Sequence, residues 1–157
     1  MTEVNGLRLA YRGFVTGLAG GYVWAAIAML LAALASGDAL APLRPFAEAL
    51  APVAPSSELA FVLGLATVQA GGAFIGMVFA YFFARFFTVR FTLAIAAPVV
   101  ALLTWGLIAA AFTRDVDGTI FAGSAAPILA TLGYGLFLAA GVPVRGEVLR
   151  YSRSPST

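Results

Sequence analysis

Four long apolar runs constrain this chain more than any other feature of its sequence. They cover residues 13–35, 59–84, 91–112 and 119–142, and none of them contains an acidic or basic residue. A helix that spans a bilayer needs about 20 apolar residues, so each run is long enough to cross a membrane. The runs leave little of the 157 residues for a soluble domain. The sequence therefore predicts a single all-α integral membrane domain, a bundle of four transmembrane helices followed by a polar tail at 143–157.

The arginines are distributed unevenly around these runs. Seven of the nine basic residues would lie on one side of the membrane and two on the other, namely Arg8, Arg12, Arg85, Arg90, Arg145, Arg150 and Arg153 against Arg44 and Arg114. The positive-inside rule then places both termini and the 85–90 turn in the cytoplasm. We expect a multi-pass protein of a bacterial inner membrane.

A cleaved leader is the alternative for the first run. Ala33-Leu34-Ala35 before Ser36 resembles a signal-peptidase site, and cleavage would leave three spans. The apolar stretch 13–35 is much longer than the roughly 7–15 residues of a signal h-region, so a retained span is favoured.

Small residues repeat at every fourth position on the first two runs. The two stripes are Gly13, Gly17, Gly21 and Ala25, and Gly72, Gly76, Ala80 and Ala84. A glycine inside a soluble helix costs about 1 kcal/mol relative to alanine. In lipid, however, small residues let helices approach closely. We expect these stripes, a glycine zipper, to pack the first two spans together; the alternative is that one stripe faces another protein or a second copy in a homo-oligomer.

The connection between these two runs carries its own helical pattern. Within 42–52, apolar residues recur at helical spacing between flanking prolines, which predicts a short amphipathic helix on the outer membrane surface; the alternative is a docking segment for a partner. Ser56 or Ser57 is expected to cap the second span.

Aromatic residues crowd the predicted inner turn. They are Tyr81, Phe82, Phe83, Phe86, Phe87 and Phe91, close to Arg85 and Arg90. The simple interpretation is an interfacial belt with snorkelling arginines. The sharper one is a surface that contacts a lipid, a carotenoid or a chlorin, and Trp105 is added as a further contact of this kind.

The chain lacks the residues that several kinds of cofactor and metal site require. The chain has no Cys and no His, which excludes thiolate metal sites, iron–sulfur ligation and histidine-ligated or covalently held cofactors. A net charge of +2 is too small to indicate nucleic-acid binding. Gln69 is the strongest polar group inside any run, and no catalytic constellation is recognisable, so we expect a protein that is not an enzyme.

A weak internal repeat relates the last two runs. Residues 96–107 align without gaps to 125–136 with seven of twelve positions identical, and the alignment matches Pro98 to Pro127 and Trp105 to Tyr134. Both prolines are expected to kink their helices. Inverted repeats of this kind occur in transporters, so a small oligomeric channel or transporter is one functional hypothesis.

The first run and its outer loop also resemble a known group of proteins. The stretches are GFVTGLAGGYVWAAIAMLLA and SGDALAPLRPFAEALAP, which resemble uncharacterised small bacterial four-span membrane proteins. This resemblance implies a four-helix membrane fold and no assigned activity. Our leading expectation is a non-catalytic accessory or scaffold subunit of a respiratory or photosynthetic energy-transducing assembly, with other integral membrane subunits and lipid as partners.

Overall fold

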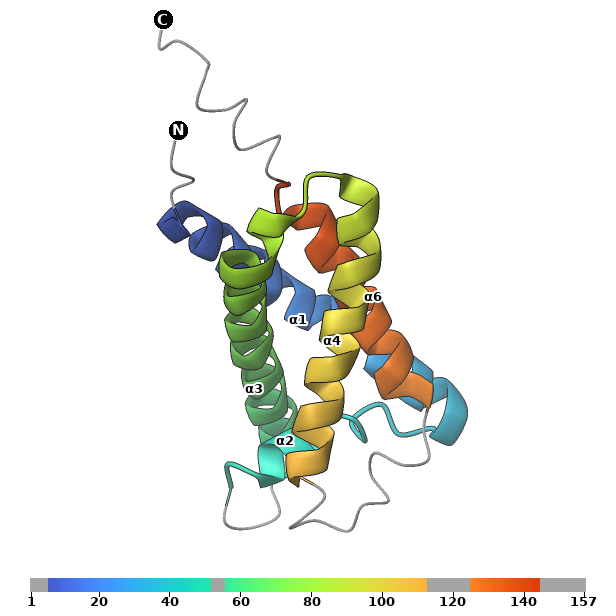
Figure 1. The fold of residues 1–157 in the computed structure, drawn as a ribbon. Coiled ribbons are helices and arrows are strands. Elements are labelled where there is room, and N and C mark those ends of the chain that lie inside the picture. The colour runs from blue at the N-terminus through green and yellow to red at the C-terminus, as the bar shows by residue number, and fades with distance from the viewer. Residues whose placement is uncertain (1–5, 52–55, 113–124, 145–157) are drawn as a thin grey trace, which may run out of the picture.

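Helices make up every regular element that the structure describes. The structure is a computed structural model and describes residues 6–51, 56–112 and 125–144 (Figure 1). Its main helices are α1 (Gly6–Ser36), α3 (Ser57–Val78), α4 (Arg90–Phe112) and α6 (Ala125–Gly141), with a short α2 (Arg44–Glu48). The predicted all-α class is confirmed.

Three of these helical segments are long and apolar enough to cross a membrane. They are Gly6–Ser36, Ser57–Phe83 and Arg90–Ile108, whereas α6 has only 17 described residues. The predicted fourth span at 119–142 is therefore represented by α6 alone, and 119–124 lie outside the described residues, as does most of the 143–157 tail. The arrangement supports a membrane protein.

Helix α1 is longer than the predicted span at its N-terminal end. The described helix extends from Gly6, so it includes the stretch 6–12 in addition to the predicted apolar run from residue 13. Its 31 residues correspond to about 46 Å at 1.5 Å per residue, against about 30 Å of bilayer core. Figure 1 shows α1 running obliquely to α3 and α4. The helix ends where Gly37 adopts a φ of 74° and its N–H bonds the carbonyl of Ala33 at 3.0 Å.

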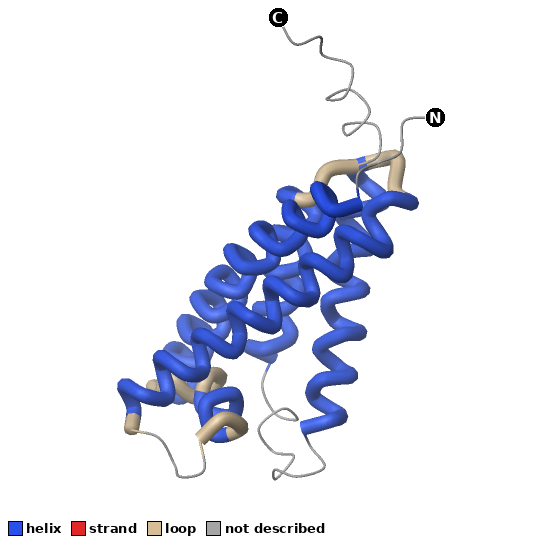
Figure 2. The backbone as a smooth tube through the Cα atoms, turned by 90° about the vertical axis from the view of Figure 1, so that its left-hand side faces the viewer, coloured by secondary structure: helices blue, strands red, loops and turns tan. Residues whose placement is uncertain are grey.

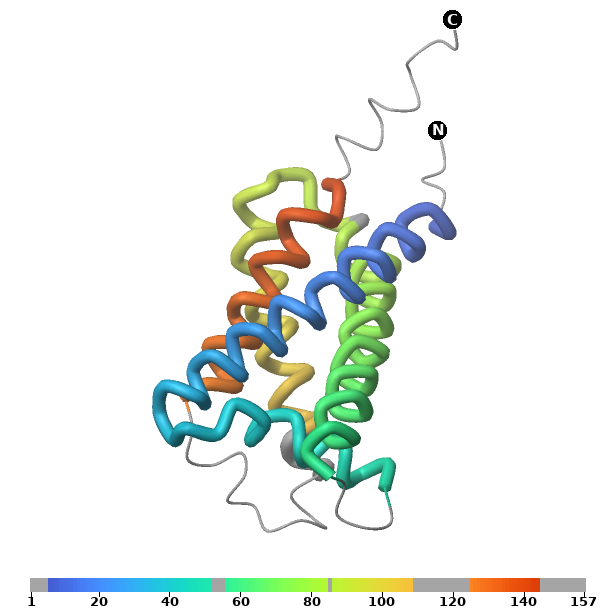
Figure 3. The backbone as a smooth tube through the Cα atoms, turned by 180° about the vertical axis from the view of Figure 1, so that it is seen from behind, coloured from blue at the N-terminus to red at the C-terminus, as the bar shows by residue number. Residues whose placement is uncertain are grey.

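The long helices form an open arc in the spatial order α3, α1, α6, α4. Helix α1 packs against both α3 and α6, and α6 packs against α4, while α3 and α4 meet only sparsely. Figure 3 shows α1 lying between α6 and α3, with α4 behind. Two consecutive hairpins, α1–α3 and α4–α6, are thus joined through α1 and α6, and no helix within residues 6–51, 56–112 and 125–144 closes the side between α3 and α4.

The two small-residue stripes lie against each other at the α1–α3 crossing. A Cβ placed on Gly17 would collide with the carbonyl of Gly72 and lie 3.0 Å from the Cα of Gly76. One placed on Gly13 would collide with Gly76 and Ala80. Backbones meet here with no room for a side chain, which is the close approach that small residues permit in a membrane.

Helix α3 changes its winding near its end, where a single α-helix to residue 84 was predicted. Ser56 caps its start as predicted, accepting the N–H of Leu59 at 3.4 Å. Beyond Val78 the chain forms a π turn at Phe79–Phe83 and a 3₁₀ turn at Ala84–Phe86. An every-fourth-residue stripe drifts by about 40° per step around an α-helix. The slower winding of the π turn offsets this drift, so Ala80 and Ala84 both remain fully buried.

The segment around α2 packs into one end of the bundle with its apolar side chains. The predicted helix at 42–52 is shorter, Arg44–Glu48, and its Pro45, Phe46 and Ala47 are buried. Leu43 is fully buried against Gly64, where an added Cβ would lie 2.5 Å from the Leu43 carbonyl oxygen. The apolar face of this segment therefore packs on α3, and its position relative to a membrane surface stays a prediction.

The second hairpin is held at a close crossing and at a helix end. A Cβ on Gly135 would lie 2.7 Å from the nitrogen of Pro98, which stands inside α4. Pro127 is the third described residue of α6, and residues 113–124 lie outside the described part of the chain, so the kink expected there stays a prediction. The Arg90 guanidinium donates to the carbonyls of Ala139, Ala140 and Val142 at 3.0, 3.0 and 3.2 Å. This caps the C-terminus of α6 with a cation.

The two ends of the bundle are formed by different segments. The start of α1, the turn between α3 and α4, and the end of α6 lie at one end, and α2 lies at the other (Figures 1 and 2).

Candidate functional site

A cavity of about 210 Å³ occupies the open side of the arc, between α3 and α4. Each of the five α-helices that the structure describes contributes to its lining, with Gly21, Trp24, Phe46, Thr67, Val68, Gly71, Gly72, Ile75, Ala101, Trp105, Ile108, Thr131 and Tyr134. We call it the lateral cavity. Gly71 is among these lining residues, and a Cβ built there meets nothing within 4 Å. Its walls are almost wholly apolar.

The few polar groups in the floor of the lateral cavity bond to one another or to the backbone. The Trp24 Nε1 donates to the Thr131 hydroxyl at 3.0 Å, and that hydroxyl donates to the Pro127 carbonyl at 2.7 Å. The Tyr134 hydroxyl donates to the Gly72 carbonyl at 2.7 Å. These bonds join α1, α3 and α6 beneath the cavity. A molecule in the cavity would therefore meet an apolar surface whose polar atoms are already satisfied.

Three aromatic rings form the outer wall of the lateral cavity. The ring centroids of Trp24 and Trp105 are 5.3 Å apart, and Phe46 lies 5.8 Å from Trp24 and 6.1 Å from Trp105. We call these residues the aromatic triad. They come from α1, α4 and α2, so the buried position of α2 is what completes the triad. Aromatic pairs at such distances contribute about 0.5–1.5 kcal/mol each beyond their buried area.

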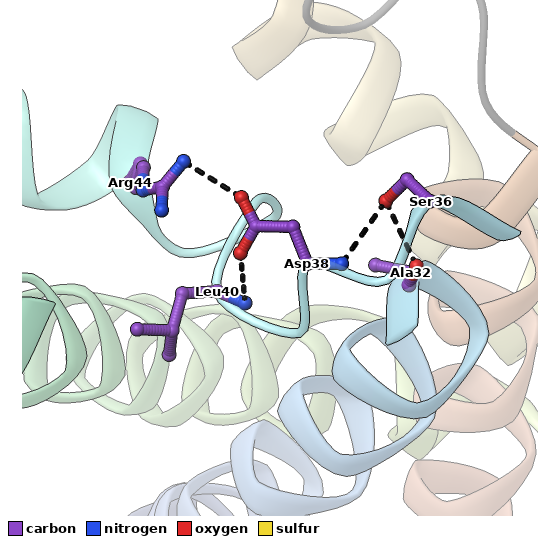
Figure 4. A network of polar contacts seen from close by, with 5 residues as sticks. All are labelled: Ala32, Ser36, Asp38, Leu40 and Arg44. Carbon is purple, nitrogen blue, oxygen red and sulfur yellow. Dashed lines mark hydrogen bonds and ion pairs between the residues drawn. The ribbon is translucent and has the colours of Figure 1, made fainter. Parts of the chain in front are cut away.

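A second, more polar cavity has a volume of about 400 Å³. Trp24 and Trp105 line both cavities, and this outer cavity also includes Ser36, Arg44 and Glu48. Figure 4 shows how the adjoining loop is fixed: one Asp38 oxygen pairs with Arg44 at 2.7 Å and the other accepts the N–H of Leu40 at 3.1 Å. Ser36 links this turn to Ala32 at the end of α1.

The predicted aromatic contact residues do not form one site. Tyr81, Phe82, Phe83, Phe86 and Phe91 are exposed at the α3–α4 turn, and Phe87 is half-buried against the core. Trp105 lies 14 residues beyond Phe91 on α4, about 21 Å along the helix axis, and lines the lateral cavity instead. None of the six residues at the turn lines either cavity.

Gln69, the predicted polar group of the membrane interior, faces the α1–α3 crossing. A Cβ on Gly21 would lie 2.9 Å from the Gln69 Cα, and Gln69 lines neither of the two cavities. Its Nε2 is buried and has no hydrogen-bond partner among the described residues. The structure therefore does not place Gln69 on a polar path through either cavity.

Sequence reasoning missed most of the residues that build the lateral cavity. Trp24, Phe46, Thr131 and Tyr134 were not singled out as contact residues, and Gly20 was not assigned to either stripe. An added Cβ on Gly20 would lie 2.8 Å from the Tyr134 ring, so this glycine makes the space that the ring occupies. The available signal was the match of Trp105 to Tyr134 in the internal repeat, since both residues line the lateral cavity.

The described residues offer no obvious site for a metal ion. No three Asp, Glu, His or Cys side chains gather within residues 6–51, 56–112 and 125–144 at metal-binding distance. Comparisons with protein-family models, with curated proteins and with solved structures gave no match. The interpretation of the site therefore rests on its geometry.

Proposed function

We propose that this chain is a non-catalytic integral membrane protein that holds an apolar membrane molecule, and that it serves as an accessory subunit of a larger membrane assembly. The observation that carries the proposal is the lateral cavity on the open side of the arc. A chain that leaves an aromatic-walled space between two of its membrane helices requires another molecule, a lipid, a pigment or a partner helix, to fill it.

The polar groups that line the lateral cavity favour binding of an apolar molecule over catalysis. The hydroxyl groups of Thr131 and Tyr134 donate hydrogen bonds to backbone carbonyls, and the Trp24 indole donates to the Thr131 hydroxyl. No acidic or basic residue lies within 13–35, 59–84, 91–112 or 119–142. Proton-coupled transport relies on such groups within the membrane.

The same observations disfavour the channel or transporter hypothesis. A conducting path needs polar or ionisable lining, whereas the lateral cavity is apolar and Gln69 points elsewhere. We retain that hypothesis as the alternative because Trp105 and Tyr134, matched in the internal repeat, face the same cavity. Solute flux through liposomes containing the purified chain would favour the alternative.

The proposed orientation follows from the arginines. Both termini and the α3–α4 turn would lie in the cytoplasm, and α2 and the outer cavity would lie at the opposite surface of a bacterial inner membrane. The outer cavity would then sit at headgroup level.

Gentle extraction from the native membrane tests the proposal. Native electrophoresis with absorbance scanning, followed by mass spectrometry of protein and small molecules in the band, should find this chain with other membrane subunits and a bound apolar molecule. A respiratory or photosynthetic partner would be recognised by its absorbance. A colourless band that contains this chain alone, with no apolar molecule bound, would contradict the proposal.

A further inference from the structure

Two cavities of different polarity share two aromatic side chains. The lateral cavity is apolar, the outer cavity carries charged side chains, and Trp24 and Trp105 line both. A molecule that reaches from one to the other must therefore be amphiphilic, with an apolar part between α3 and α4 and a polar part beside α2.

The outer cavity presents both signs of charge one helical turn apart. Arg44 and Glu48 occupy positions i and i+4 on α2, and both line the cavity. The ion pair between Arg44 and Asp38 involves Nη1. A guanidinium has five N–H donors, so Arg44 can still bind an oxyanion. An anionic headgroup would be repelled by Glu48 and Asp38, and a cationic one by Arg44, whereas a group that carries both charges can match each to its opposite.

The lateral cavity is large enough for an alkyl segment. An apolar protein cavity of about 150 Å³ stays dry and binds benzene. The lateral cavity, at about 210 Å³, exceeds that volume. Because α3 and α4 do not close this side, hydrocarbon chains of a surrounding bilayer would have direct access to it.

We propose that the two cavities together bind one zwitterionic phospholipid. Its phosphate would bind Arg44, its ammonium group would bind Glu48, and one acyl chain would pass the aromatic triad into the lateral cavity. This inference rests on the proposed function, since it names the molecule that the cavity holds. It assigns Arg44 and Glu48 to headgroup selection and Gly71 to the acyl-chain site.

Two glycine substitutions distinguish the effect of filling the lateral cavity from the effect of placing a larger side chain elsewhere on a helix. In Gly71→Leu the new side chain enters the lateral cavity, where an added Cβ meets open space. In Gly106→Leu, the matched control, the side chain also meets open space, but Gly106 is exposed on α4 and does not line the cavity. Both changes replace a glycine inside a helix with the same better helix former.

The experiment is native mass spectrometry of the chain released from nanodiscs of equal parts phosphatidylethanolamine and phosphatidylglycerol. We expect the wild type and Gly106→Leu to retain one phosphatidylethanolamine, and Gly71→Leu to retain at least tenfold less. We expect Glu48→Gln to shift the bound lipid toward phosphatidylglycerol, because the repelling carboxylate is gone. This headgroup measurement alters an exposed side chain, so it remains informative if Gly71→Leu does not fold.

The outcomes distinguish the inference from the proposed function. The lipid inference is overturned if phosphatidylglycerol is preferred by the wild type, or if Glu48→Gln leaves the preference unchanged. A different apolar molecule, carried by the protein from its native membrane and lost in Gly71→Leu, would overturn the lipid inference and leave the proposed function standing. Equal retention of the lipid by Gly71→Leu and Gly106→Leu would show that the lipid does not occupy the lateral cavity and would overturn the lipid inference.

Discussion

The indole Nε1 of Trp24 donates a hydrogen bond to the Thr131 hydroxyl at 3.0 Å, which links α1 to α6 across 107 residues of sequence. Both side chains are buried. The bond lies in the floor of the lateral cavity and also holds Trp24 in the aromatic triad. One polar contact therefore joins the two hairpins and positions a ring that lines both cavities.

Removing the Thr131 hydroxyl should destabilise the bundle by more than its size suggests. Thr131→Val keeps the volume but leaves the Trp24 N–H without its acceptor, which we expect to cost about 1–3 kcal/mol. Thr131→Ser is the control, because it keeps the hydroxyl and loses only a methyl group, at about 1 kcal/mol. Thermal unfolding in detergent, followed by circular dichroism, compares the two. A melting temperature as high for Thr131→Val as for Thr131→Ser would argue that the hydrogen bond contributes little.

The same glycine-to-alanine change should have opposite signs on the two faces of the α1–α3 hairpin. Gly17→Ala places a methyl group against the Gly72 carbonyl and must push the helices apart, whereas Gly71→Ala adds it to open space. The helix-propensity gain of about 1 kcal/mol is common to both. We expect Gly17→Ala to lose stability by about 1–3 kcal/mol through overpacking and Gly71→Ala to be neutral or more stable. Steric trapping of unfolding in bicelles measures the difference; equal effects would contradict the observed crossing.

The spans and the glycine stripes could be predicted because they are properties of neighbouring residues on one helix. Run length indicates a span, and a four-residue repeat places Gly13, Gly17 and Gly21 on one face. The lateral cavity could not be predicted in this way. It depends on α1 packing against α6 while α3 and α4 stay apart, and on Phe46 of α2 packing next to Trp24 and Trp105. Those relationships join residues far apart in sequence.

Replacing Gln69 distinguishes the proposed binding of an apolar molecule from the channel or transporter hypothesis. The Gln69 Nε2 is buried without a described partner, so Gln69→Leu should be neutral or raise stability by about 1 kcal/mol. A channel that relied on this amide would lose its flux in the same variant. We expect no change in bound lipid and no flux with or without the substitution. The paired measurements are thermal unfolding and solute release from liposomes, and flux abolished by Gln69→Leu would support the alternative.

Arg90 should act as a clamp between the start of α4 and the end of α6. Its guanidinium donates to the carbonyls of Ala139, Ala140 and Val142 at the end of α6. The last carbonyls of a helix otherwise have no partner within the helix. Arg90→Lys keeps the charge but has no planar fork, and Arg90→Met keeps an apolar stem alone. Hydrogen bonds to charged groups contribute about 1.5–3 kcal/mol, so we expect stability to fall in the order wild type, Lys, Met. Hydrogen exchange at Leu138–Val142 should quicken in the same order, and protection unaffected in Arg90→Met would show that the cap is dispensable.

Single cysteines can test the proposed orientation, because the natural chain has none. Leu50 lies beyond α2 and Val89 lies in the α3–α4 turn, and both side chains are more than half exposed. The positive-inside rule places Leu50 outside and Val89 in the cytoplasm. A membrane-impermeant maleimide added to intact cells should therefore label Leu50→Cys at once, and Val89→Cys only after the membrane is permeabilised. Labelling in the reverse order would invert the orientation and move the outer cavity, with Arg44 and Glu48, to the cytoplasmic leaflet. Labelling of both positions in intact cells would indicate mixed insertion, which the seven-to-two distribution of arginines argues against.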